Sequence, residues 1–139
     1  MTAYVVDSSV AVKWYVPETH SESAVNLLDE GHELHAPDLL RPEFGNTLWK
    51  KFQRKELTEK EVKSILVAFA AVPLQIHSSQ EIFEAAVEIS LKTSRTVYDS
   101  LYVALAVALN LNLVTADERL FNSLQSSPFA NHIQHVKQF

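Results

Sequence analysis

Ala3-Tyr4-Val5-Val6-Asp7-Ser8-Ser9 lies near the start of the 139-residue chain, and its apolar half stops abruptly at a carboxylate and two hydroxyls. Aromatic and β-branched residues favour a strand. Asp and Ser end strands and begin helices, because their side chains accept hydrogen bonds from the first free backbone N–H groups of a helix. We therefore predict a buried central strand over residues 3–6.

The same short apolar pattern returns further along the chain. Residues 33–36, 74–77 and 113–115 are predicted strands, bounded by turn and capping residues. Helical signals lie between them, such as the apolar residues at every fourth position from Leu40 to Phe52 and a Thr-x-x-Glu capping box at Thr19. The helices predicted from these signals cover residues 10–15, 21–30, 37 onward, 58–71, 78 onward and 98–110.

Alternation of helices with short hydrophobic strands favours an α/β fold whose parallel sheet is covered on both faces. The composition agrees with one ordinary globular unit, at 47% hydrophobic and 21% charged residues. Only two glycines and five prolines are present, so no linker is indicated. We predict a single domain over residues 1–139, with one core.

The composition also restricts the chemistry. The absence of cysteine excludes disulfides, thiolate-bound zinc and a cysteine nucleophile, and it suits a reducing cytoplasm. No signal-peptide pattern is visible, and the longest apolar run, residues 101–109, is shorter than the ~20 residues of a membrane span. We therefore expect a cytoplasmic protein without a membrane partner.

The net charge of −5 is opposite to the basic surface expected of a protein that binds nucleic acid electrostatically. Several of the acids are expected in one place, where a divalent cation would reverse the local sign. Ligands bind at the carboxyl ends of parallel strands in open sheets, and Asp7 and Asp117 follow directly on predicted strands. Asp99 lies near the start of the most apolar helix, and Glu43 lies next to a buried stripe.

Each acid alone has a simpler explanation. Asp7 and Asp117 suit helix N-caps, Asp99 suits the positive end of a helix, and Glu43 suits a partly solvated helix position. Together, however, converging carboxylates repel one another unless a cation neutralises them. Oxygen ligands select Mg²⁺ or Mn²⁺. Such an ion supplies positive charge to a phosphate and activates the attacking water, so the set predicts phosphodiester hydrolysis.

Four segments resemble, in order, the blocks of PIN domains, and most of all the VapC-type toxins of bacterial and archaeal toxin–antitoxin pairs. They span residues 5–9, 36–48, 98–106 and 113–117. The resemblance implies a Rossmann-like, three-layer α/β/α sandwich with a short parallel sheet. It also implies an endoribonuclease that acts on RNA, forms a homodimer and is inhibited by an antitoxin protein.

The resemblance assigns catalysis and metal binding to the four acids, which are Asp7, Glu43, Asp99 and Asp117. By the same matching, Ser9 and Thr115 are supporting hydroxyls beside the carboxylates. Asn46 follows Glu43 by one helical turn, so it is predicted to lie on the same face and to hydrogen-bond the site.

The sequence also bears on two other functions. A receiver-type phosphoacceptor domain needs an acidic pair after the first strand and an acceptor Asp after the third, whereas this chain has Asp7-Ser8-Ser9 and His77-Ser78. A catalytically silent binding module with the PIN fold is the second alternative, and the sequence does not decide against it. His132 and His135 are predicted surface histidines of an extended tail.

Two further groups of residues allow more than one interpretation. The basic cluster at residues 50–55 suits phosphate contact and a solvated helix end equally well. The aromatic residues, Tyr102 among them, suit the core or an interface better than base stacking.

Overall fold

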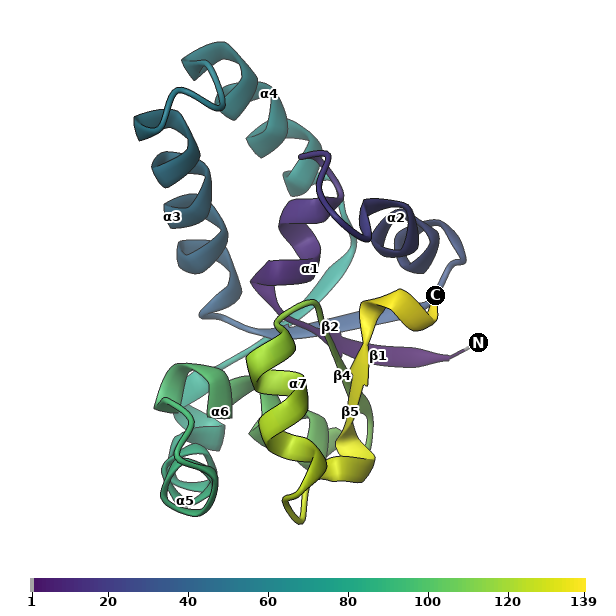
Figure 1. The fold of residues 1–139 in the computed structure, drawn as a ribbon, viewed down its shortest axis with the longest axis vertical. Coiled ribbons are helices and arrows are strands. Elements are labelled where there is room, and N and C mark those ends of the chain that lie inside the picture. Colours follow the sequence, from purple (N-terminus) through teal and green to yellow (C-terminus); the bar gives the residue numbers. More distant parts are fainter. Residues whose placement is uncertain (1) are drawn as a thin grey trace.

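The computed structural model describes residues 2–139 and contains a five-stranded, wholly parallel sheet in the order β3-β2-β1-β4-β5 (Figure 1). The predicted α/β class and parallel sheet are confirmed. The strands are β1 (Ala3–Val6), β2 (Glu33–Pro37), β3 (Leu74–His77), β4 (Asn112–Thr115) and β5 (Ile133–His135).

Helices cover both faces of the sheet and make the predicted three-layer sandwich. In Figure 1, α1 to α4 lie on one side of the sheet and α5 and α6 on the other, while α7 packs on β4 and β5. The helices are α1 (Ser8–Lys13), α2 (Ser21–Asp29), α3 (Leu40–Gln53), α4 (Glu59–Ala70), α5 (Phe83–Thr93), α6 (Val97–Leu109) and α7 (Glu118–Gln125), with 3₁₀ turns η1 (Ser79–Ile82), η2 (Ala130–His132) and η3 (Val136–Gln138).

Strand β1 is central, as predicted, and both of its last two valines are fully buried. It pairs with β2 on one side and with β4 on the other, and Val6 lies opposite Val114. Asp7 follows Val6, and Thr115 follows Val114. The register of the two strands therefore places the carboxylate of Asp7 beside the hydroxyl of Thr115 at the carboxyl edge of the sheet. That edge is where ligands bind in sheets of this type.

Helix α6 forms the middle of the core on the other face. Residues 100–106 are all buried, and the helix contacts β1, β2 and β4. Its first turn is capped by Thr96, whose hydroxyl accepts from the backbone N–H of Asp99 at 3.1 Å. The cap fixes Asp99 at the end of the helix, next to the carboxyl edge of the sheet.

Several predicted boundaries are wrong for local reasons. The N-cap of α2 is His20, which makes no side-chain capping bond, so Thr19 does not form the predicted capping box. Pro37 belongs to β2, and α3 begins at Leu40. Phe52 continues the four-residue spacing but is 40% exposed, because α3 has passed the edge of the core there. A capping box is present at Thr58, the N-cap of α4, where the helix predicted over residues 58–71 begins.

The predicted extended tail is instead a fifth strand. Residues 133–135 pair with β4, and α7 packs against them. His135 is therefore fully buried rather than on the surface, whereas the ring of His132 lies 3.0 Å from the carbonyl oxygen of Leu111. Three residues are too few for an alternating pattern to be recognised.

Among residues 2–139, no helix combines the length and the apolar character that crossing a bilayer requires.

Candidate active site

Asp7 ends β1 and begins α1 at the same time. Its side chain is almost fully buried. One carboxylate oxygen, Oδ1, accepts from the hydroxyl of Ser9 at 2.5 Å and from the backbone N–H of Val10 at 3.3 Å. The other, Oδ2, accepts from the hydroxyl of Thr115 at 2.5 Å. Asp7 is thus a helix N-cap and also the centre of a polar cluster.

The surroundings of Asp7 disfavour the charged form of its carboxyl group. Burial raises its pKa from 3.8 to about 6, the charge of Asp117 adds to the rise, and the hydrogen bonds from Ser9, Thr115 and Val10 oppose it. A carboxylate in low dielectric next to a second one is costly unless positive charge is supplied. Hence the surroundings of Asp7 fit a bound cation.

Ser9 and Thr115, the predicted supporting hydroxyls, both contact Asp7. Each also binds the loop after β4, because Ser9 Oγ accepts from the N–H of Ala116 and Thr115 Oγ1 from that of Asp117, both at 3.0 Å. Asp117 then caps α7 through Oδ1, which accepts from Leu120 N at 3.1 Å. One hydrogen-bonded unit therefore fixes Asp7 and Asp117 relative to each other.

Glu43 lies in the first turn of α3 and is half-buried. Its Oε1 accepts from the phenol hydroxyl of Tyr102 at 2.5 Å. Burial raises the pKa of Glu43 and the charge of Asp99 adds to the rise, whereas the bonds from Tyr102 and from the hydroxyl of Ser8 oppose it. Asp99 therefore lies within electrostatic reach of Glu43.

Tyr102 connects the two halves of the cluster. Its ring is buried, and burial together with the charges of Glu43, Asp7 and Asp99 raises the pKa of its hydroxyl, so that it stays a hydrogen-bond donor. The sequence predicted only a core or interface aromatic at this position. A signal was present, since Tyr102 follows Asp99 by one helical turn and faces the same way.

Asp99 has a cationic neighbour that the sequence did not single out. Oδ2 of Asp99 accepts from the guanidinium of Arg95 at 2.9 Å, and both side chains are partly buried. Asn46 is exposed, and its support of the site stays a prediction. The next residue, Thr47, lies nearer the site, since it lines a hollow together with Ser8 and Ser9.

The four acids gather at one edge of the sheet but do not form a closed cage. Among residues 2–139, no three of them bring ligand oxygens within 4.8 Å of one another. Mg²⁺ suits such an open arrangement, because it keeps several waters and binds directly to only one or two carboxylates. All the donors are oxygens, so the set fits a hard divalent cation.

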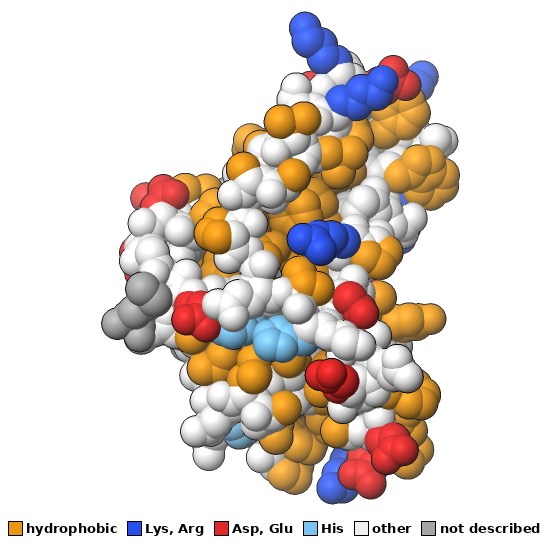
Figure 2. Space-filling view, turned by 180° about the vertical axis from the view of Figure 1, so that it is seen from behind, with side chains coloured by type: hydrophobic (Ala, Val, Ile, Leu, Met, Phe, Trp, Pro, Cys, Tyr) orange, Lys and Arg blue, Asp and Glu red, His pale blue; other side chains and the backbone are white. Residues whose placement is uncertain are grey.

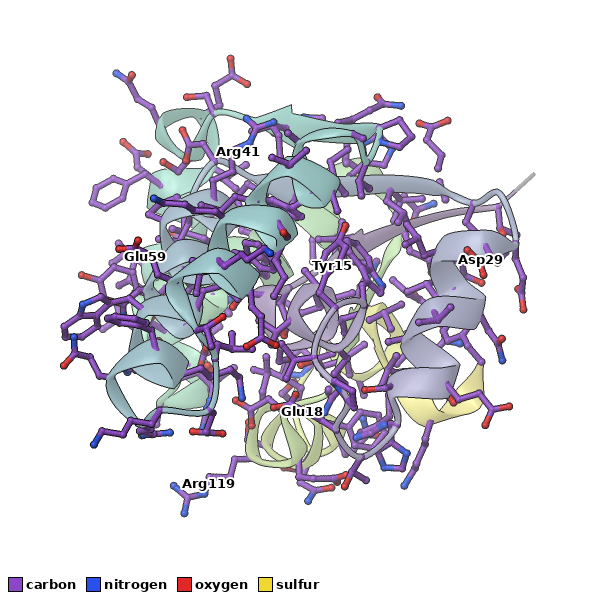
Figure 3. The ribbon with its side chains drawn as sticks, turned by 90° about the horizontal axis from the view of Figure 1, so that it is seen from above. Tyr15, Glu18, Asp29, Arg41, Glu59 and Arg119 are labelled. Carbon is purple, nitrogen blue, oxygen red and sulfur yellow. The ribbon has the colours of Figure 1, made fainter. Side chains whose placement is uncertain are left out.

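A hollow of about 280 Å³ is lined by Ser8 and Ser9, which follow Asp7, and by Ala116, which precedes Asp117. Lys13 and Lys51 reach into it from α1 and α3, and both ammonium groups pair with Glu18, at 3.4 and 2.8 Å. Figure 3 shows Arg119 pointing away from the molecule, whereas only 12% of the Lys51 side chain is exposed. Lys51 of the predicted basic cluster is therefore tied inward rather than solvated. The lining residues are Ser8, Ser9, Val12, Lys13, Glu18, Thr47, Lys51 and Ala116.

Tyr102→Phe tests whether the phenol positions Glu43. The substitution keeps the ring and removes the donor, which leaves a half-buried carboxylate oxygen without its partner, at a cost of about 1–3 kcal/mol. We expect the concentration of Mg²⁺ or Mn²⁺ needed for half-maximal activity to rise about tenfold. Tyr98→Phe, at an exposed tyrosine one turn earlier, is the control. An unchanged metal requirement in Tyr102→Phe would remove the phenol from this role.

Comparison with known proteins identifies the family. The family model of the PIN domain matches residues 4–125. The chain is 40% identical over 120 residues to ribonuclease VapC3 of Pyrobaculum aerophilum, covering 84% of this chain and 90% of that protein. Two solved structures share the fold: a toxin–antitoxin complex from Klebsiella pneumoniae (TM-score 0.69, 13% identity, 96% and 97% coverage) and VapC20 of Mycobacterium tuberculosis, described as a sarcin–ricin loop cleaving toxin (0.67, 10%, 86% and 94%). The chain belongs to the PIN domain family.

Proposed function

We propose that the chain is a Mg²⁺- or Mn²⁺-dependent endoribonuclease of the VapC type and the toxin of a toxin–antitoxin pair. The observation that carries the proposal is the state of Asp7, a buried carboxylate with a raised pKa, held by two hydroxyls next to Asp117 at the carboxyl edge of the sheet. The ribonuclease name of its 40% identical relative supports the same activity.

The proposed roles follow from the contacts. Asp7, Glu43, Asp99 and Asp117 hold the cation, directly or through water. When bound, the ion supplies positive charge to the scissile phosphate and lowers the pKa of water. Ser9 and Thr115 orient Asp7, and Tyr102 orients Glu43. Lys13 and Lys51 share Glu18 and so leave one net positive charge in the hollow beside Ser8 and Ser9, which suits an RNA backbone despite the net charge of −5.

The test is cleavage of RNA by the purified chain. We expect internal cleavage of a structured RNA with Mg²⁺ or Mn²⁺, and none when EDTA removes the ion. Cleavage that persists in EDTA would overturn the metal dependence, and no cleavage of transfer, ribosomal or messenger RNA would favour the catalytically silent module. No observation favours the receiver-type alternative, because Ser78 follows β3 and serves only to cap η1.

Two exposed apolar faces fit the proposed protein partners. On α3 and α4, the side chains of Trp49, Phe52, Leu66 and Val67 are exposed, and Figure 2 shows hydrophobic side chains gathered at this end of the molecule. A hollow of about 240 Å³ lies between Trp49 and Val62. We propose that the antitoxin covers this face, and that toxin and antitoxin meet in the cytoplasm.

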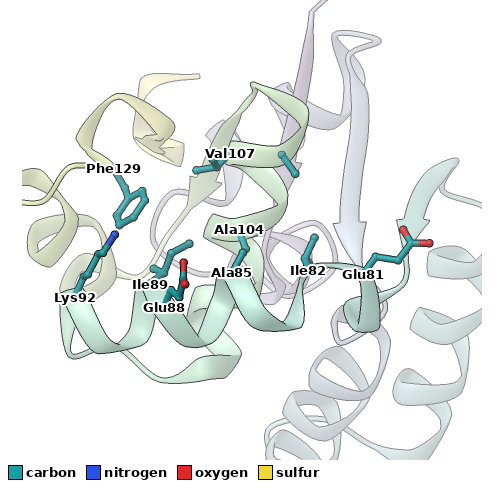
Figure 4. A pocket seen from close by; sticks show the side chains of 10 residues that line it. Glu81, Ile82, Ala85, Glu88, Ile89, Lys92, Ala104, Val107 and Phe129 are labelled. Atoms are coloured by element: carbon teal, nitrogen blue, oxygen red, sulfur yellow. The ribbon is translucent and has the colours of Figure 1, made fainter.

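The proposed homodimer uses α5. Phe83, Val87 and Leu91 follow one another at four-residue spacing, and Leu91 is 80% exposed. On another side of α5, and lined by none of these three residues, a hollow of about 350 Å³ lies between α5, α6 and Phe129 (Figure 4). An exposed apolar stripe of this kind can pack against the same stripe of a second copy in a two-fold interface.

Leu91→Glu is expected to give the mass of a single chain by light scattering, where the unchanged chain gives that of two. The substitution places a charge in the proposed interface at a position where it costs the fold little, because Leu91 is exposed. Val67→Glu, at an equally exposed residue of the other face, is expected to remain a dimer. A dimer in Leu91→Glu would move the interface elsewhere.

A further inference from the structure

Three side chains from distant parts of the chain meet beyond the end of β5, outside the four-acid site. His20 precedes α2, Glu118 begins α7 and His135 ends β5. Their ligand atoms all lie within 4.8 Å of one another. We propose that His20, Glu118 and His135 form a second divalent metal site, selective for ions of the Zn²⁺ class rather than for Mg²⁺.

His135 is the anchor of this site. Its side chain is fully buried, and its Nε2 atom has no hydrogen-bond partner. Glu118 Oε1 lies 2.8 Å away, yet the two atoms are not aligned as a hydrogen bond. A buried polar atom without a partner costs about 1–3 kcal/mol, and a metal ion at Nε2 removes that cost. Burial also lowers the pKa of His135, which keeps the ring in the uncharged form that binds metals.

His20 adopts an unusual backbone conformation that brings its ring to this place. Its φ of 67° lies in the left-handed region, which few residues other than glycine occupy. The side chain makes no capping bond to α2. Instead its ring meets the edge of the His135 ring, with the centroids 5.3 Å apart. Such local strain is typical of functional positions, and here it serves the approach of the two imidazoles.

The ligand set decides the class of ion. Two imidazoles and one carboxylate are the protein ligands of open zinc sites, whereas Mg²⁺ takes oxygen ligands. In a tetrahedral zinc site, two ligand atoms that each lie about 2.1 Å from the metal are about 3.4 Å apart, which is somewhat closer than the 4.8 Å within which these ligand atoms lie. Small side-chain rotations therefore suffice to close the site.

One proton has to move when the ion binds. In the free ring, Nδ1 accepts from the backbone N–H of Lys137 at 3.0 Å, so the ring proton is on Nε2. A metal bond to Nε2 displaces this proton to Nδ1, and the bond from Lys137 is then given up. We therefore expect ion uptake to change the amide resonance of Lys137.

The experiment is calorimetric titration of the full chain with Zn²⁺, in an Asp99→Asn background that weakens binding at the four-acid site. We expect one Zn²⁺ per chain, and at least about tenfold weaker affinity for His20→Ala and for Glu118→Gln. Neither side chain is buried, so these variants are expected to fold, unlike His135→Ala. His32→Ala is the control, because His32 pairs with Glu30 at the same 2.8 Å distance but has no second histidine beside it among residues 2–139.

The outcomes separate cleanly. Loss of affinity in His20→Ala and Glu118→Gln, with none in His32→Ala and with a shifted Lys137 amide, supports the site. Equal affinity in all variants, or no Zn²⁺ uptake, overturns it. Cleavage of RNA is not part of this test, so its result is independent of the proposed nuclease function.

Discussion

Asp7→Asn is expected to reduce metal-dependent RNA cleavage at least about 10³-fold. The substitution keeps the shape of the side chain and its capping role, since Asn is as good an N-cap as Asp. What it removes is the negative charge of the most buried of the four acids and one of the two oxygens that accept from Ser9 and Thr115. Losing a charged ligand of a catalytic ion removes several kcal/mol of stabilisation, and about 4 kcal/mol corresponds to 10³ in rate.

The control is Asp29→Asn, which makes the same chemical change at an exposed residue at the end of α2. Cleavage by this variant is expected to equal that of the unchanged chain. Cleavage by Asp7→Asn within about tenfold of the unchanged chain would remove Asp7 from the centre of the site. Circular dichroism of both variants shows whether the fold is retained.

In metal-free buffer at pH 7.5, Asp7→Asn is expected to raise the free energy of unfolding by about 1–3 kcal/mol. The pKa of Asp7 is about 6 in the folded chain and 3.8 in the unfolded one. Between these values the folded state binds the extra proton, so the stability of the unchanged chain falls as pH rises from about 4 to about 6. The loss is complete above pH 6 and amounts to about 3 kcal/mol, because each pKa unit corresponds to about 1.4 kcal/mol.

Urea unfolding in EDTA at pH 5 and pH 7.5 measures this effect. Asn does not titrate, so the variant is expected to show a smaller fall in stability over this range, and Glu43, whose pKa is also raised, contributes to the fall that remains. Adding Mn²⁺ is expected to stabilise the unchanged chain much more than the variant, because the ion binds the folded state. A variant less stable than the unchanged chain at pH 7.5 would contradict the strained state of Asp7.

The sequence predicted the centre of the fold because its strands are buried on both faces and end abruptly. Val5 and Val6 are followed at once by Asp7, and the same change occurs from Val114 and Thr115 to Asp117. Parallel pairing then brings the two acids to one edge. The sequence could not predict β5, because three residues are too few to show the alternation of a strand. For the same reason it could not predict that His135 is buried.

The sequence singled out the four acids of the candidate site but not the groups that surround them in the structure. For Asp117, a helix N-cap and a site acid are alternative interpretations of the sequence. In the structure both hold, because one carboxylate oxygen caps α7 while the charge of the group acts on Asp7. Tyr102 and Arg95 were missed as partners, since a tyrosine in an apolar helix and an arginine before it are ordinary in a sequence. Their roles depend on where α3 and α6 cross the sheet, which no local pattern specifies.

Crystals grown with Mn²⁺, measured for its anomalous scattering, test most directly whether these carboxylates share an ion. We predict an anomalous peak in ligand contact with Asp7 and with at least one of Glu43, Asp99 and Asp117. Crystals that bind Mn²⁺ only elsewhere, or not at all at saturating concentration, would contradict the account.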